Sequence, residues 1–205
     1  MLLHAPERWR PLLLVAAFTG LRAGELRGLR WGDVDLKENE LHVRQRADRW
    51  GDMDLPKSEA GERDVPFGKI VANTLKEYRL RSQYSSDGEL VFCSSNGTVL
   101  EHSNMLKQSL HKAQVLAGIT GKDGEPKYTG LHSLRHFYAS WCINRTKDGG
   151  LGLPPKNVQE RLGHSSITIT LDTYGHLFKA DDVEELDAAE LALISGNATQ
   201  TRHAG

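Results

Sequence analysis

Residues 9–30 of the chain read Trp-Arg-Pro-Leu-Leu-Leu-Val-Ala-Ala-Phe-Thr-Gly-Leu-Arg-Ala-Gly-Glu-Leu-Arg-Gly-Leu-Arg. Apolar residues are nearly continuous over 9–18, and Pro11 falls where a first helical turn tolerates proline, so a buried helix is predicted there. Two leucines three positions apart predict a second short helix over 23–30. The apolar run 12–18 is too short to span a bilayer, so no membrane association is expected.

A small sheet is predicted next along the chain, over residues 34–66. Short alternating runs at 34–36 and 41–44, and a third that closes at Asp64-Val65-Pro66, are typical of antiparallel strands. The polar stretch 57–63 is predicted to be a hairpin loop between the last two of them. The sheet is therefore expected to have three strands.

From residue 68 onward the pattern is helical. Further helices are predicted around Val71, Leu75 and Tyr78; around Leu106, Leu110, Ala113 and Ala117, capped by Ser103 and ended by Gly118; over 155–162, opened by Pro155; over 166–178, capped by Ser165; and over 181–194, before a polar tail. The predicted fold class is α+β, mainly α-helical, with a small three-stranded antiparallel sheet near the N-terminus.

The charge is balanced overall but unevenly distributed. The 205 residues include 26 Lys and Arg and 27 Asp and Glu, a net charge of −1, which excludes a polycation that grips nucleic acid by bulk charge. Residues 1–171 hold 24 basic and 20 acidic side chains, a net of +4, whereas seven acidic and two basic residues follow from Asp172 onward. Net charge therefore does not exclude DNA binding by the first part of the chain.

Cysteine usage argues against a disulfide framework. Cys93 and Cys142 lie 49 positions apart and form no paired motif. Neither a disulfide scaffold nor a structural zinc site is expected, and a reducing cytoplasm is the favoured location.

Five segments place cationic, imidazole or phenolic groups in suggestive contexts: Thr19–Leu26, Lys57, Leu131–His136, Leu162–His164 and Asp172–His176. Each segment alone has an ordinary explanation. An Arg beside a Glu on a helix is usually a surface ion pair, and a loop lysine is usually solvated. Tyr174 also falls in line with apolar residues of its helix and could be a core tyrosine.

Taken in order, the five segments resemble the catalytic domain of the tyrosine recombinases, the phage integrase family. The resemblance covers residues 10–180. In that family a Thr-Gly-Leu-Arg-x-x-Glu-Leu block, here residues 19–26, is followed by a lysine in a β-hairpin and a His-x-x-Arg-His block. A Leu-Gly-His block and a tyrosine then follow, and here Tyr174 lies ten residues beyond His164.

The resemblance implies site-specific DNA strand cleavage and rejoining through a 3′-phosphotyrosine. Two arginines suit the non-bridging phosphate oxygens, because a guanidinium keeps its charge and offers a planar fork. The implied roles are a clamp by Arg22 and Arg135, attack by Tyr174, proton acceptance by His132, protonation of the leaving 5′ oxygen by Lys57, and a hydrogen bond to the phosphate from His164.

Several further residues are expected to support or extend this site. Glu25 is interpreted as orienting the Arg22 helix, and His136 and His176 either support the catalytic groups or are satisfied core histidines. Lys122 and Lys127, in the loop before His132, are candidate phosphate contacts. No metal ion and no cofactor are expected, because no metal-ligand motif is present and the proposed chemistry needs none.

The family pattern also sets expectations for organisation and partners. Residues 1–180 are interpreted as the catalytic domain and 181–205 as a C-terminal helix and tail, and the N-terminal DNA-clamping domain of the family is expected to be absent. The expected partners are double-stranded DNA attachment sites and further copies of the chain, in a homo-tetramer on DNA. The free state is left open, a monomer being one candidate, as is packing of the C-terminal helix in cis or in trans.

Two other functions remain open at this point. One is a nicking-closing activity like that of type IB topoisomerases, whose chemistry is related. The other, from a different class, is a non-catalytic or regulatory DNA-binding module descended from a recombinase. The Thr-Gly-Leu-Arg and Leu-Gly-His blocks and the length of the chain favour a recombinase over a topoisomerase-like enzyme. The intact catalytic set argues against a non-catalytic module.

Overall fold

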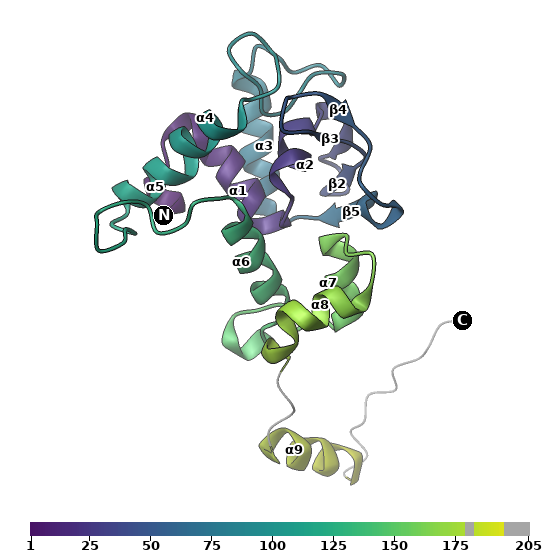
Figure 1. Ribbon diagram of the computed structural model, residues 1–205. Helices are drawn as coiled ribbons and strands as arrows, with labels where there is room; N and C mark the ends of the chain where they lie inside the picture. Colours follow the sequence, from purple (N-terminus) through teal and green to yellow (C-terminus); the bar gives the residue numbers. More distant parts are fainter. Residues whose placement is uncertain (179–182, 195–205) are drawn as a thin grey trace.

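The apolar stretch near the N-terminus forms α1 (Arg10–Thr19), a buried helix in a computed structural model that describes residues 1–178 and 183–194. Its Leu12, Leu13 and Val15 are fully buried, and it packs against α3 (Lys69–Arg81) and α6 (His132–Ile143) (Figure 1). The prediction of a buried helix is therefore confirmed.

Gly20 ends α1 for a steric reason. Its φ of 63° is the left-handed conformation that glycine adopts without strain. A Cβ at this position would lie 2.4 Å from Cδ1 of Tyr138 on α6. The Thr-Gly-Leu-Arg block therefore brings the main chain close against α6.

The second helix, α2 (Ala23–Gly28), is shorter than predicted. Leu29 and Arg30 are extended because they pair with another segment. The Val91 N–H donates to the Leu29 carbonyl at 2.8 Å, and Arg30 forms a β-bridge with Leu90. Tertiary pairing thus overrides the local helical pattern at these two residues.

The predicted three-stranded antiparallel sheet is present, in the order β1–β2–β5. Its strands are β1 (Val34–Asp35), β2 (Glu40–Val43) and β5 (Arg63–Pro66), with Leu41 opposite Val65 and His42 opposite Asp64. The connection from β2 to β5 is more than a simple hairpin loop, because it contains a second ribbon of β3 (Arg46–Ala47) and β4 (Met53–Asp54). Lys57 lies between β4 and β5.

The middle of the chain is helical, with one correction to its start. A continuous helical stretch comprises α4 (His102–Leu106), a π-helical segment (Lys107–His111) and α5 (Lys112–Leu116). The expected cap, Ser103, is wrong. Glu101 caps the helix instead, because its carboxylate accepts hydrogen bonds from the main-chain N–H groups of Ser103 and Asn104 at 2.8 and 2.6 Å.

Two short helices follow α6, namely α7 (Pro155–Leu162) and α8 (Ile167–Tyr174). Pro155 opens α7 as predicted. The prediction for α8 is wrong at both ends. Ser166 rather than Ser165 occupies the N-cap position, and the helix gives way at Gly175 to a 3-10 turn (Gly175–Leu177), since glycine is a poor helix former. Tyr174 is therefore the last residue of α8.

The core consists of two clusters joined by α6. The larger cluster surrounds α1 and includes residues of α2, α3, the sheet and Leu134 of α6. The smaller cluster begins at Tyr138 and contains buried residues of α6, α7 and α8, three helices that lie next to one another in Figure 1. The residues between Leu134 and Tyr138 on α6 thus lie at the boundary between the two clusters.

The last described element is α9 (Val183–Ile194), which lies apart from the other helices in Figure 1. Its side chains Leu186, Leu191, Leu193 and Ile194 are exposed. Of the predicted helix 181–194 and its tail, residues 181–182 and 195–205 lie outside the described part of the chain. None of the helices over residues 1–178 and 183–194 is both long and apolar enough to cross a bilayer.

We predict that Gly20→Ala destabilises the fold more than a matched substitution does. Gly118→Ala is the control, because Gly118 has a similar φ of 69° but a Cβ added there would meet no heavy atom of the described residues within 4 Å. Backbone strain alone costs about 1–3 kcal/mol at either site, and the clash with Tyr138 adds to it at Gly20. Urea unfolding measures the loss of stability in both variants. Equal losses of unfolding free energy in Gly20→Ala and Gly118→Ala would contradict the close contact of Gly20 with α6.

Candidate active site

Five of the six predicted catalytic residues line one open cleft of about 310 Å³. The cleft lies where the start of α2, the first turns of α6 and the α7–α8 connection meet. Its lining residues come from segments far apart in the sequence: Arg22, Ser58, His132, Arg135, His136, Gly163, His164, Ser165, Ile169, Thr173 and Tyr174. The fold therefore brings together what the sequence separates by about 150 residues.

Glu25, which is predicted to orient the Arg22 helix, is in direct contact with Arg22. The buried carboxylate accepts the main-chain N–H of Arg22 at 2.8 Å and Nη1 of the same residue at 2.8 Å. Arg22 Nη2 then donates to the Gly163 carbonyl at 3.2 Å, which links the Thr-Gly-Leu-Arg block to the Leu-Gly-His block. The guanidinium of Arg22 is thus held at the cleft.

Arg63 is a functional neighbour that sequence reasoning missed. Its Nη1 and Nη2 donate to the two carboxylate oxygens of Glu25 at 3.1 and 2.9 Å, and its Nε donates to the Arg161 carbonyl at 2.8 Å. Burial would raise the pKa of Glu25, but the charges of Arg63 and Arg22 lower it to about 2. Strand alternation could have indicated this residue, because Arg63 and Val65 are alternate residues of β5 and therefore share its inward face. A charge on that face requires a charged or hydrogen-bonding partner.

Arg135 is almost fully buried, at 2% exposure, yet it reaches the cleft. Its Nη1 donates to the Gly20 carbonyl at 2.8 Å and its Nη2 donates to the Leu162 carbonyl. Burial, followed by the charge of Arg22, lowers the pKa of Arg135 to about 9, so the side chain remains a cation at neutral pH. Its position is therefore set by the main chain of two other motifs.

The two histidines beside these arginines favour the neutral form. Burial, followed by the charges of Arg135 and Arg22, lowers the pKa of His164 to about 4. Burial, His136 and Arg135 lower the pKa of His132 in the same direction. His164 Nδ1 lies 2.9 Å from the Thr170 hydroxyl, an interaction that fixes the orientation of the ring.

Tyr174 is 5% exposed and its hydroxyl is hydrogen-bonded to His136 Nδ1 at 2.8 Å. The two rings lie 5.6 Å apart in an edge-on arrangement. Burial raises the pKa of Tyr174, while the charge of Arg135 opposes this effect. The phenol is therefore held in the cleft in its protonated form.

The structure places four other predicted residues away from this cleft. Lys57 is exposed and lines a neighbouring groove, although the adjacent Ser58 reaches the cleft. His176 is exposed on the 3-10 turn after α8, and Lys122 and Lys127 are exposed in the loop before α6.

The neighbouring groove, of about 770 Å³, shares Arg22 with the cleft and is rich in cations. Arg46 and Arg49 on the β3–β4 ribbon line it together with Lys57, and the Arg49 guanidinium lies 4.7 Å from the centre of the exposed Trp50 ring. Sequence reasoning missed these ribbon residues, because the ribbon itself was not predicted. A cationic groove with an exposed aromatic ring suits a nucleic-acid backbone.

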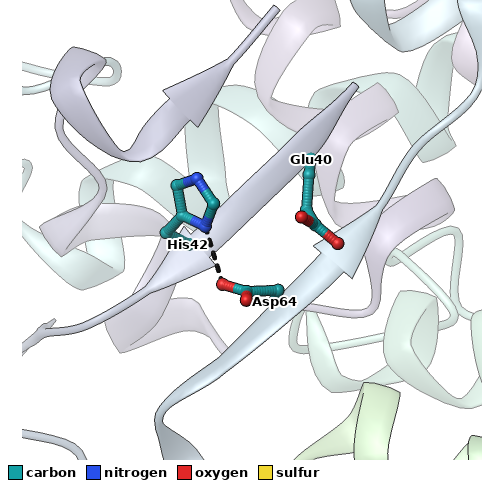
Figure 2. A group of neighbouring side chains, drawn as sticks. All are labelled: Glu40, His42 and Asp64. Carbon is teal, nitrogen blue, oxygen red and sulfur yellow. Dashed lines mark hydrogen bonds and ion pairs between the residues drawn. The ribbon is translucent and has the colours of Figure 1, made fainter. Parts of the chain in front are cut away.

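A separate cluster of titratable groups lies on the solvent face of the sheet. Figure 2 shows Glu40, His42 and Asp64, whose ligand atoms all lie within 4.8 Å of one another. His42 Nδ1 and Asp64 Oδ1 are 2.6 Å apart, directly across the β2–β5 pair. This contact is a cross-strand ion-pair geometry that supports the register of the sheet.

We predict that His164 makes stability depend on pH between about 6.5 and 4. Its pKa is about 4 in the folded chain and about 6.5 in the unfolded chain, so the unfolded chain binds the extra proton first. Stability from this group is present above pH 6.5 and is lost as the pH falls toward 4. The free energy of unfolding, measured with urea at pH 7 and pH 5, should therefore differ less between the two pH values in His164→Asn than in the wild type.

The exposed His4 offers a matched control for this measurement, since His4→Asn removes an imidazole outside the cleft. Glu25 does not interfere, because its stabilising effect is lost only as the pH falls from about 4.5 toward 2. An unchanged pH dependence in His164→Asn would contradict the buried, neutral state of this imidazole.

Comparisons with known proteins agree with the geometry. The chain is 34% identical to a tyrosine recombinase XerC-like protein of Caldanaerobacter subterraneus, over 88% of this chain and 49% of that protein. It is 30% identical to the tyrosine recombinase XerC of Neisseria meningitidis, over 74% of this chain and 42% of that protein. The chain thus spans about half the length of the curated relatives it matches.

Solved structures share the fold. The Tn1549 transposon integrase, solved in complex with circular intermediate DNA, superposes with a TM-score of 0.66 at 22% identity, over 91% of this chain and 60% of that one. The XerA recombinase superposes with a TM-score of 0.61 at 23% identity, over 95% of this chain and 58% of that one. The family model of the phage integrases matches residues 3–181, and the chain therefore belongs to the phage integrase family.

Proposed function

We propose that this chain is a tyrosine-type site-specific DNA recombinase that cleaves and rejoins strands of double-stranded attachment sites through a 3′-phosphotyrosine at Tyr174. The observation that carries the proposal is the convergence of Arg22, Arg135 and two histidines with Tyr174 in one cleft. A phosphodiester bound between the arginines lies within reach of the phenol. The relatives named as recombinases support the same activity.

Arg22 and Arg135 hold the scissile phosphate. Both guanidiniums are oriented before DNA arrives, because each donates to a main-chain carbonyl of the Leu162–Gly163 segment. Pre-oriented cations stabilise the charge that builds on the non-bridging oxygens without reorganising during the reaction. These two cations neutralise the negative charge that develops on the phosphate in the transition state, so the proposed mechanism requires no metal ion.

His164 completes the phosphate site as a neutral donor. When the Thr170 hydroxyl donates to Nδ1, the ring hydrogen resides on Nε2, at the other edge of the imidazole. That N–H then donates a hydrogen bond to a non-bridging oxygen. Glu25 supports the arrangement indirectly, by holding Arg22.

Cleavage exchanges one phosphoester bond for another. The Tyr174 oxygen attacks phosphorus, the bond to the 5′ oxygen breaks, and the phenolic proton passes to an imidazole at the start of α6. Lys57 gives a proton to the departing 5′ oxygen once DNA in the groove draws its loop toward the cleft. Rejoining reverses these steps, so the bond energy is conserved and no nucleotide cofactor is consumed.

DNA would follow the cationic groove next to the cleft. Arg46, Arg49 and Lys57 line that groove, and Lys122 and Lys127 remain proposed phosphate contacts from the loop before α6. Contacts of this kind position a duplex but do not read its sequence. A protein acting on DNA in this way belongs in the cytoplasm.

Assembly on DNA is proposed to use α9 in trans. Its exposed leucines present an apolar surface that its own chain does not cover in the described residues. An apolar groove of about 720 Å³ beside the cleft, lined by Tyr128, Leu134 and Phe137 among others, suits such a helix from a second copy. Because His132 and His136 also line this groove, docking there would couple neighbouring active sites in a tetramer.

The first prediction is a covalent adduct that depends on Tyr174. The purified chain is mixed with a pool of nicked duplexes whose bases flanking the nick are randomised, and adducts that survive denaturation are recovered and sequenced. The nick lets the cleaved end diffuse away, which traps the phosphotyrosine. Tyr174→Phe should give no adduct, because it lacks the attacking oxygen.

The outcomes separate the candidate functions. Adducts enriched in one sequence support a site-specific recombinase, whereas adducts without sequence preference favour a nicking-closing activity. Binding of duplexes without any adduct above the Tyr174→Phe background would favour a non-catalytic DNA-binding module and would overturn the proposal.

A second prediction concerns α9. Deleting residues 183–205 should abolish or weaken the tetramer that forms on the recovered duplex, as measured by light scattering, but should leave adduct formation within a few-fold of the intact chain. Leu191→Glu offers a milder variant with the same expected loss. Loss of cleavage in a folded deletion variant would contradict a purely assembling role for this helix.

A further inference from the structure

We propose that His136, rather than His132, is the base that accepts the proton of Tyr174 in cleavage and returns it in rejoining. His132 then serves the phosphate together with the two arginines. The inference rests on the proposed function of the cleft and assigns a role that the family resemblance gave to another residue.

The contact geometry separates the two imidazoles. His136 Nδ1 is 2.8 Å from the Tyr174 hydroxyl, within the range for proton transfer to a general base. His132 lies one helical turn earlier on α6, and its ring meets that of His136 edge-on at 4.6 Å between centroids. Of the two imidazoles, His136 is therefore the one that is hydrogen-bonded to the attacking oxygen.

The surroundings of His132 suit a role at the phosphate. Loss of hydration lowers the pKa of His132, and the neighbouring His136, Arg135 and Arg22 lower it further, so the neutral imidazole is favoured. His132 lines the same cleft as Arg22 and Arg135, where a neutral imidazole can donate a hydrogen bond to the phosphate that they are proposed to bind. His136 instead contacts the Tyr174 hydroxyl through Nδ1, where it can take the phenolic proton and hold it until rejoining.

Tyr174 needs such a base because its surroundings protect the neutral phenol. Burial raises its pKa above the ordinary value, and the charge of Arg135 offsets only part of this effect. Few phenolate ions would therefore form without an acceptor at the hydroxyl. An acceptor already hydrogen-bonded to the oxygen removes that obstacle at the moment of attack.

The step balances in both directions. In cleavage the Tyr174 O–H bond breaks, its proton joins His136 Nδ1, the oxygen bonds to phosphorus, and the bond from phosphorus to the 5′ oxygen breaks with protonation by Lys57. In rejoining the 5′ hydroxyl attacks and gives its proton back to the neutral Lys57 amine, the bond from phosphorus to Tyr174 breaks, and the His136 imidazolium returns its proton to the phenolate oxygen. The same residue thus acts as base and then as acid.

The test uses single-turnover adduct formation on the nicked duplex recovered with the intact chain. His136→Ala should slow the reaction by about 100-fold or more, the usual contribution of a general base. His136→Asn places an amide oxygen near the position of Nδ1, so it can orient the phenol but cannot take its proton. It should remain slow, and it is the second variant should the alanine substitution impair folding.

Two chemical substitutions then isolate the proton transfer. Ring-fluorinated tyrosine at position 174 has a more acidic phenol, so the difference between wild type and His136→Asn should shrink. A duplex with sulfur in place of the bridging 5′ oxygen has a leaving group that needs no protonation. This duplex should restore the rate of adduct formation in Lys57→Ala. It should leave both His136 variants as slow, relative to the wild type, as they are on the ordinary duplex.

Several results would overturn the inference. A wild-type rate of adduct formation in His136→Ala would show that His136 is dispensable. Full rescue of the rate by His136→Asn would show that it only orients the phenol. The same conclusion would follow if fluorination left the rate difference between wild type and His136→Asn unchanged. His4→Asn, outside the cleft, is the control for loss of an imidazole and should react at the wild-type rate. Because every comparison starts from an adduct formed by the wild type, its absence would count against the proposed function instead.

Discussion

One buried carboxylate, that of Glu25, holds the walls of the cleft together. Glu25 accepts four hydrogen bonds, from the main chain and guanidinium of Arg22 and from both terminal nitrogens of Arg63. Removing a charge from water is costly unless it is paired and fully hydrogen-bonded, and here both conditions are met. Glu25 thus joins α2 to β5, and Arg63 joins both to the end of α7 by donating to the Arg161 carbonyl. Arg22 extends from this cluster to the cleft.

The cleft lies at the boundary between two hydrophobic clusters, and this explains its polar construction. Leu134 belongs to the larger cluster and Tyr138 to the smaller one, while Arg135 and His136 lie between them on α6. At this boundary the side chains of Arg22 and Arg135 join the two sides by donating to the main-chain carbonyls of Gly20, Leu162 and Gly163. The same bridges leave N–H groups near the space that a phosphate would occupy.

Much of the fold and of the cleft could be predicted from sequence, for identifiable reasons. Arg22, Arg135 and Tyr174 stand in short motifs whose order is specific, and α1 has a continuous apolar pattern. The β3–β4 ribbon and the cap by Glu101 could not be predicted, since strands of two residues and a single capping side chain carry little periodic signal. The partner of the Tyr174 hydroxyl depends on how α6 and α8 face each other, which no local pattern encodes.

The double attachment of Arg135 has a consequence for how this protein can change over time. A side chain that joins the carbonyls of Gly20 and Leu162, and that is also proposed to bind the phosphate, cannot be replaced by one that fulfils only one of these roles. A lysine keeps the charge but lacks the fork that spans two carbonyls. Inactive descendants of such a chain should therefore arise by loss of Tyr174 or of an imidazole more readily than by loss of this arginine, because folding itself selects for it.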